Sequence, residues 1–97
     1  MSNQICIEPT KFENVRDGGV TYGFRAYDAY GSTYNNNLES IPDDDLEFLK
    51  EVVKHEAEDE ALAVMLDFVR ETERTICIGG VAYGWNEIEE VLKQVAQ

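Results

Sequence analysis

The stretch RTICIGGVAY, residues 74–83, says more about the fold than any other part of the chain. Its first half is rich in the β-branched residues that strands favour. Gly79-Gly80 suits the positive φ angles of a two-residue type I′ turn. The stretch therefore predicts a β-hairpin, with one strand over residues 74–78 and its return over residues 81–83.

The segment after this hairpin predicts a helix. Asn86 can cap its start, and Glu89 follows three residues later as in a capping box. The apolar residues that follow are spaced to form one buried helical stripe. They are Ile88, Val91, Leu92 and Val95.

The segment before the hairpin predicts two further helices. Pro42 and Asp43 suit a helix start, the first by its fixed φ and the second by capping. Two apolar sets at helical spacing follow, over residues 46–53 and 62–69. One helix of about 30 residues would be roughly 45 Å long, too long for so small a domain to cover. We therefore expect a break near residues 56–59.

The first third of the chain predicts strands. Residues 4–8 have strand character, and we expect Pro9 to end that strand. A second strand begins at Val20, and its alternate residues should face opposite sides of a sheet. Residues 32–34 can return beside it, and residues 35–37, all asparagine, read as a polar loop.

Together these segments predict a single α+β domain over residues 1–97, in the order βββ-α(α)-ββ-α. Hairpins with helices between and after them favour an antiparallel sheet. We expect about four or five strands, with two or three helices packed on one face.

The charge of the chain excludes several classes of partner. Twenty acidic residues face eight basic ones, for a net charge of −12. Such a field repels nucleic acid and anionic membranes and attracts basic surfaces. The sequence shows no signal peptide at its N-terminus and no apolar run of the roughly 20 residues that cross a bilayer, so we expect a cytoplasmic protein.

Cys6 and Cys77 each lie between two isoleucines. Their separation does not form a redox or zinc motif. They read as small buried residues in a reducing compartment, and the alternative is a cross-strand contact that oxidises in air.

The sequence shows no pattern typical of an enzyme. His55 is the only histidine, begins an incomplete zinc-protease motif, and reads as a solvated helix residue. The run of acids at residues 43–45 has neither the glycine nor the distant glutamate of a calcium loop. We therefore predict no catalytic residue, no metal and no cofactor. The remaining alternative of this class is an enzyme that uses a carboxylate cluster with a metal.

Two features qualify as a partner-binding site. Residues 39–60 hold ten acids against two lysines, and carboxylates recur at helical spacing within them. Tyrosines are frequent in the predicted strands, and tyrosine is enriched in protein interfaces. The alternatives are a solvated acidic face that aids solubility and ordinary sheet packing. The candidate residues are Asp43, Asp44, Glu47, Glu51, Glu58, Asp59, Tyr27, Tyr30 and Tyr34.

In size and charge the chain resembles the small acidic anti-defence proteins of phages and mobile elements, which include DNA mimics of the anti-restriction and anti-CRISPR types. The resemblance rests on the overall profile and on no motif. It implies a non-enzymatic inhibitor that binds a basic, nucleic-acid-handling protein. The alternative is a plain interaction or assembly module, such as a homodimer joined through the tyrosine-rich strands.

Overall fold

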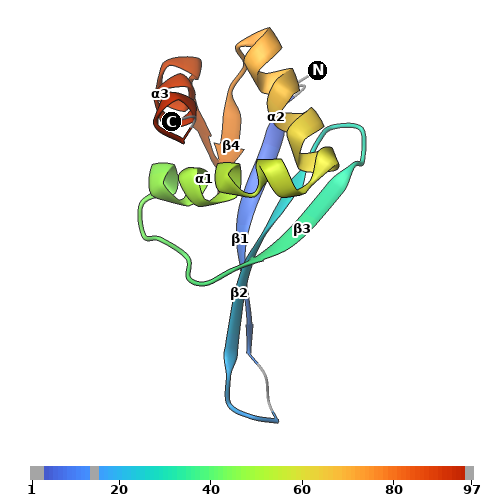
Figure 1. The fold of residues 1–97 in the computed structure, drawn as a ribbon, viewed down its shortest axis with the longest axis vertical. Coiled ribbons are helices and arrows are strands. Elements are labelled where there is room, and N and C mark those ends of the chain that lie inside the picture. The colour runs from blue at the N-terminus through green and yellow to red at the C-terminus, as the bar shows by residue number, and fades with distance from the viewer. Residues whose placement is uncertain (1–3, 14–15, 96–97) are drawn as a thin grey trace.

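The protein is described by a computed structural model that covers residues 4–13 and 16–95 (Figure 1). The prediction that the chain has no signal peptide concerns the N-terminus, where residues 1–3 lie outside the described residues. The strands are β1 (Ile5–Glu13), β2 (Val20–Tyr27), β3 (Thr33–Leu38), β4 (Ile76–Ile78) and β5 (Val81–Tyr83). The helices are α1 (Asp45–Lys54), a 3₁₀ turn η1 (Glu56–Glu58), α2 (Glu60–Thr72) and α3 (Trp85–Val95). The α+β class is as predicted, and the order of elements differs slightly from the prediction because the 3₁₀ turn η1 lies between α1 and α2.

The five strands form one mixed sheet in the order β3-β2-β1-β4-β5. β1 pairs antiparallel with β2 but parallel with β4, so the prediction of an antiparallel sheet was wrong. The reason is the connection from β3 to β4. It passes through α1, η1 and α2 and returns the chain beside β1 in the same direction, as a helical crossover does.

Strand β1 continues through Pro9 and ends at Glu13, so Pro9 does not end it as expected. The Gly79 N–H donates to the Ile7 carbonyl, which shows that the Ile7 backbone faces the β4 side. Two residues later, Pro9 faces the same side, beyond the last β1–β4 pair at Ile7 and Ile78. Its missing N–H therefore removes no bond from the ladder.

Strand β3 contains the three asparagines that we expected to form a loop. Asn35, Asn36 and Asn37 pair with β2 opposite Arg25, Phe24 and Gly23. Pairing with a long neighbouring strand outweighs the low strand propensity of asparagine. β3 lies at the edge of the sheet, where polar side chains are well tolerated.

The break between the two middle helices is confirmed. η1 occupies Glu56–Glu58, and the Asp59 side chain caps α2. The start of α1 differs from the prediction, because Asp44 rather than Asp43 is its cap. The Asp44 Oδ1 accepts from the backbone N–H groups of Leu46 at 2.9 Å and Glu47 at 3.1 Å.

The β4–β5 hairpin is confirmed, with φ of +57° at Gly79 and +88° at Gly80. Its first strand begins at Ile76 rather than at residue 74. α3 begins at Trp85, one residue before the predicted cap. Gly84 takes the cap position instead, where its N–H donates to Glu87 Oε2 at 3.2 Å and its carbonyl accepts from Ile88.

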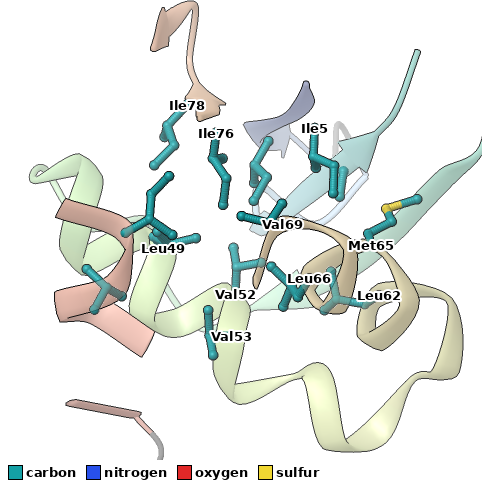
Figure 2. Packing of buried hydrophobic residues seen from close by; sticks show 14 of the residues in the cluster. Ile5, Leu49, Val52, Val53, Leu62, Met65, Leu66, Val69, Ile76 and Ile78 are labelled. Atoms are coloured by element: carbon teal, nitrogen blue, oxygen red, sulfur yellow. The ribbon is translucent and has the colours of Figure 1, made fainter. Parts of the chain in front are cut away.

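The core lies between the sheet and the helices (Figure 2). Residues of β1 and β4 meet apolar residues of α1 and α2, with Leu49, Val52, Leu66 and Val69 among them. α3 closes the core with three residues of its predicted stripe, and Val95 packs against it half-buried. The buried residues are Ile5, Ile7, Phe24, Ala26, Phe48, Leu49, Val52, Val53, Leu62, Met65, Leu66, Val69, Ile76, Ile78, Ile88, Val91 and Leu92.

The opposite face of the sheet carries the alternate residues of the same strands, and we call it the open face. The register places Cys6 beside Tyr27, Glu8 beside Arg25, and Cys6 beside Cys77. None of these five side chains belongs to the core. The hairpin of β1 and β2 extends beyond the rest of the sheet as a narrow arm (Figure 1).

Candidate protein-binding surface

Helix α1 positions the predicted acidic column. Its buried side holds Phe48, Leu49, Val52 and Val53, which turns the positions between them toward solvent. Glu47 is exposed, and Glu51 follows half-buried one turn later. Asp43 is exposed just before the cap of the helix at Asp44. Glu58 is exposed on η1. Successive turns of a helix set such carboxylates about 5–6 Å apart, a spacing similar in scale to that of backbone phosphates.

Two of the predicted binding residues have structural roles as helix caps. Asp44 caps α1, and the Asp59 Oδ1 accepts from the Ala61 N–H at 2.9 Å at the start of α2. A carboxylate at a helix N-terminus satisfies free backbone donors and interacts favourably with the helix dipole. Asp44 therefore stabilises the helix that carries Glu47 and Glu51, and Asp59 stabilises the helix that follows η1.

Two lysines partly neutralise the column from within α1. Lys50 Nζ lies 2.8 Å from Glu47 Oε1, and Lys54 Nζ lies 3.0 Å from Glu51 Oε1. Exposed pairs of this kind contribute little to stability, about 0–1 kcal/mol each. They relieve the like-charge repulsion along the helix and leave the surface strongly negative.

Further carboxylates tie the helical layer together. Arg70 of α2 binds Glu56 of η1 through both of its terminal nitrogens, with Nη2 2.8 Å from Oε2. The hydrogen bonds that Arg70 donates to Glu56 are the main reason why the pKa of Arg70 is raised. The Tyr83 hydroxyl donates to Asp45, and this bond raises the pKa of Tyr83 to about 12.

His55 is half-buried, whereas the sequence led us to expect a solvated helix residue. Its ring lies 5.7 Å from that of Phe24, and its Nδ1 lies 3.3 Å from Asn36 Nδ2. The Glu58 Oε2 is 3.6 Å from the same ring nitrogen. His55 thus packs the end of α1 against β3. Among the described residues, no three or more His, Cys, Asp or Glu side chains are placed to hold a metal ion.

The three candidate tyrosines do not gather on one surface. Tyr27 lies on the open face, where its hydroxyl donates to Glu8 at 2.9 Å and Arg25 lies over its ring. Tyr34 is half-buried on the helix-covered face, 5.7 Å from the ring of Phe24. Tyr30 lies in the β2–β3 turn and is 78% exposed.

An apolar pocket that sequence reasoning missed lies beside Tyr30. It has a volume of about 140 Å³ and we call it the Tyr30–Val64 pocket. Val64 is 63% exposed although it is apolar and lies on a helix. The signal was present in the sequence, because Val64 and Phe68 are an i, i+4 apolar pair outside the buried stripe of α2. The lining residues are Ile5, Asp28, Ala29, Tyr30, Val64, Met65 and Phe68.

Charge divides sharply between the two parts of the chain. Residues 38–97 hold sixteen of the twenty acids and five of the eight bases, a net charge of −11. Residues 1–37, which supply β1, β2 and all of β3 except its last residue, have a net charge of −1. β4 and β5 contain no charged residue, so the excess lies on the helices and their connections. One layer of the molecule is therefore strongly acidic and the other is nearly neutral.

Comparison with known protein families, curated proteins and solved structures finds no match to this chain. Within the described residues, no helix has both the length and the apolar character that a membrane crossing requires.

Proposed function

We propose that the protein is a non-enzymatic acidic binding protein that docks its helical layer on a basic, nucleic-acid-binding surface of another protein and inhibits it. The observation that carries this proposal is the segregation of charge, with −11 on the residues from Leu38 onward and −1 on the residues before it. A solubilising charge has no need to be confined to one layer. A docking charge does, because it must face its partner.

The column on α1 is the part of this layer best suited to imitate a nucleic-acid backbone. Glu47 and Glu51 are an i, i+4 pair on α1, Asp43 lies just before the cap of that helix, and Glu58 extends the acidic surface onto η1. A cytoplasmic inhibitor of the anti-restriction or anti-CRISPR type would use such a surface to compete with nucleic acid. The Tyr30–Val64 pocket could receive an apolar anchor side chain of the partner, as pockets at interface hot spots do.

The proposal is tested by capture of binding proteins from a bacterial lysate. We expect a basic, nucleic-acid-handling protein that is released by added salt, because screening weakens exposed charge pairs. Duplex DNA or RNA should also release it if both ligands occupy the same surface. A partner that stays bound at high salt and is unaffected by nucleic acid would contradict the proposal.

A set of four substitutions then tests the column itself. Asp43→Asn with Glu47→Gln, Glu51→Gln and Glu58→Gln should weaken binding of the captured partner about 100-fold, at roughly 0.7 kcal/mol per lost contact. The matched control also removes four negative charges from the helical layer but leaves the column intact. It combines the changes to glutamine at Glu71, Glu73, Glu89 and Glu90. Equal losses in both variants would show that overall charge, and not the column, drives binding.

The second candidate function is an interaction or assembly module. Two observations favour it: β3 is an edge strand, and none of the core residues in the described part of the chain lies on the open face. A homodimer could pair two β3 strands or stack two open faces around Tyr27. The molar mass in solution decides between the candidates. A dimer that Tyr27→Ala dissociates, and that neutralisation of the acidic column leaves intact, would favour assembly.

A further inference from the structure

We infer that Cys6 and Cys77 form a reversible dithiol–disulfide couple, a redox modification site on the open face of the sheet. The inference begins with the register. Cys6 and Cys77 are direct partners in the parallel pairing of β1 and β4. The chain thus brings together two thiols that are far apart in the sequence.

The geometry of the pair suits a disulfide. The isoleucines on either side of each cysteine are buried in the core, so both cysteine side chains point to the open face. Neighbouring strands lie about 4.8 Å apart, which falls within the roughly 4.4–6.8 Å that separates the Cα atoms of disulfide partners. Parallel side chains at this spacing set the Cβ atoms slightly farther apart than the roughly 3.5–4.5 Å of disulfide partners. A bond there is formed under some strain and is readily reduced.

The surroundings leave both thiols accessible. Cys6 and Cys77 are half-buried, and the open face around them carries Glu8, Arg25 and Tyr27. Burial, followed by the neighbouring Cys77 thiol, raises the pKa of Cys6. Less thiolate is then present near neutral pH, so the two thiols are oxidised slowly there and faster as the pH rises.

Oxidation proceeds by exchange with a small disulfide such as oxidised glutathione. A cysteine thiolate attacks one glutathione sulfur, and the other glutathione leaves as a thiolate. The second cysteine, once deprotonated, then attacks the sulfur of its neighbour and expels the remaining glutathione. The protein loses two electrons and two protons, and one glutathione disulfide becomes two molecules of glutathione.

The product would bind β1 to β4 covalently and close a loop of about 70 residues that contains α1 and α2. Because the loop is long, the unfolded chain is restricted far more than the folded one, and the fold gains stability. The acidic column is not altered by this reaction, so the couple is independent of the proposed function.

The test treats the purified protein with oxidised glutathione at mildly alkaline pH. We expect the mass to fall by two hydrogen atoms, both free thiols to disappear, and the chain to remain monomeric. The thermal midpoint should rise by at least about 5 °C and return after treatment with a reductant. Two free thiols that persist, or a stable glutathione adduct, would overturn the inference.

The single variants Cys6→Ser and Cys77→Ser are the controls. Each keeps one thiol and should take up one glutathione without any rise in the thermal midpoint. A midpoint that rises equally in a single variant would show that the effect does not come from a bond between β1 and β4, and would also overturn the inference.

Discussion

Gly23 is the residue at which the sheet leaves no room for a side chain. A Cβ atom there would lie 2.5 Å from the backbone oxygen of Asn36 and 3.2 Å from Thr10 Oγ1. Because β2 is paired on both sides, the clash can be relieved only if β3 moves away. Gly23→Ala should therefore lower the free energy of unfolding by about 2 kcal/mol or more, measured by urea denaturation.

Gly84→Ala is the control for this change. A Cβ atom at Gly84 meets nothing within 4 Å, and the cost is limited to a weaker cap on α3, below about 1 kcal/mol. Equal losses in the two variants would mean that the general preference for glycine, and not the close approach of β3, limits residue 23.

Tyr83 makes the stability of the protein depend on pH in the alkaline range. Its hydrogen bond to Asp45 raises its pKa to about 12, whereas an unfolded tyrosine has a pKa of about 10. The folded state holds this proton more tightly, so its contribution is complete below about pH 10 and is lost as the pH rises through about 12. The urea midpoint should fall across this window.

Tyr83→Phe removes the titrating group and should reduce this fall without abolishing it. Tyr27 supplies part of the remainder, because its bond to Glu8 likewise raises its pKa to about 12. Tyr34 adds to it, because burial raises its pKa as well. The phenolate absorbance of the folded variant should correspondingly lose one group that titrates near pH 12. A variant whose stability falls with pH as steeply as the wild type would contradict this role for Tyr83.

At the scale of elements, adjacent aspartates at the start of α1 have separable roles. Asp44 caps the helix, so Asp44→Ala should cost about 1 kcal/mol of stability in urea denaturation. Asp43 lies one residue outside the cap, and Asp43→Ala should leave stability almost unchanged while it weakens partner binding. If Asp43→Ala proves to be the more destabilising change, the cap has been assigned to the wrong residue.

The sequence predicts those elements whose signals are local. The Gly79-Gly80 turn, the break near residues 56–59 and the buried stripe of α3 each depend on neighbouring residues. The predictions for Pro9 and for the asparagines of β3 were wrong because distant segments set the places of these residues in the sheet. Pro9 lies beyond the last pair of β1 with β4, and β3 lies at an edge. The parallel pairing of β1 with β4 is likewise a property of the whole chain.

The candidate site shows the same division. Periodicity places Glu47 and Glu51 on one side of α1, and the burial of Phe48 and Val52 agrees with it. Asp43 lies before the cap at Asp44, outside the helix, so periodicity does not place it. Sequence reasoning could not tell that Tyr27 and Tyr34 face opposite sides of the sheet, because the boundaries of β3 were unknown. Nor could it tell which carboxylates serve as caps, since helix ends shift by a residue or two.

At the scale of the whole molecule, the acidic layer should work against its own folding. A net charge of −11 gathered on the helices and their connections repels itself more strongly in the folded state than in the extended chain. Added salt shortens the screening length from about 10 Å at 0.1 M to about 3 Å at 1 M. The free energy of unfolding should therefore rise with sodium chloride.

The variant with four neutralised carboxylates at residues 43, 47, 51 and 58 should show less of this rise. It loses two exposed ion pairs with Lys50 and Lys54, worth about 0–1 kcal/mol each, and gains relief from i, i+4 repulsion of about 0.2–0.5 kcal/mol per pair. The effects nearly cancel, so its stability at low salt should equal or exceed that of the wild type. A loss greater than about 1 kcal/mol would mean that the column supports the fold, and lost binding in that variant could not then be assigned to docking.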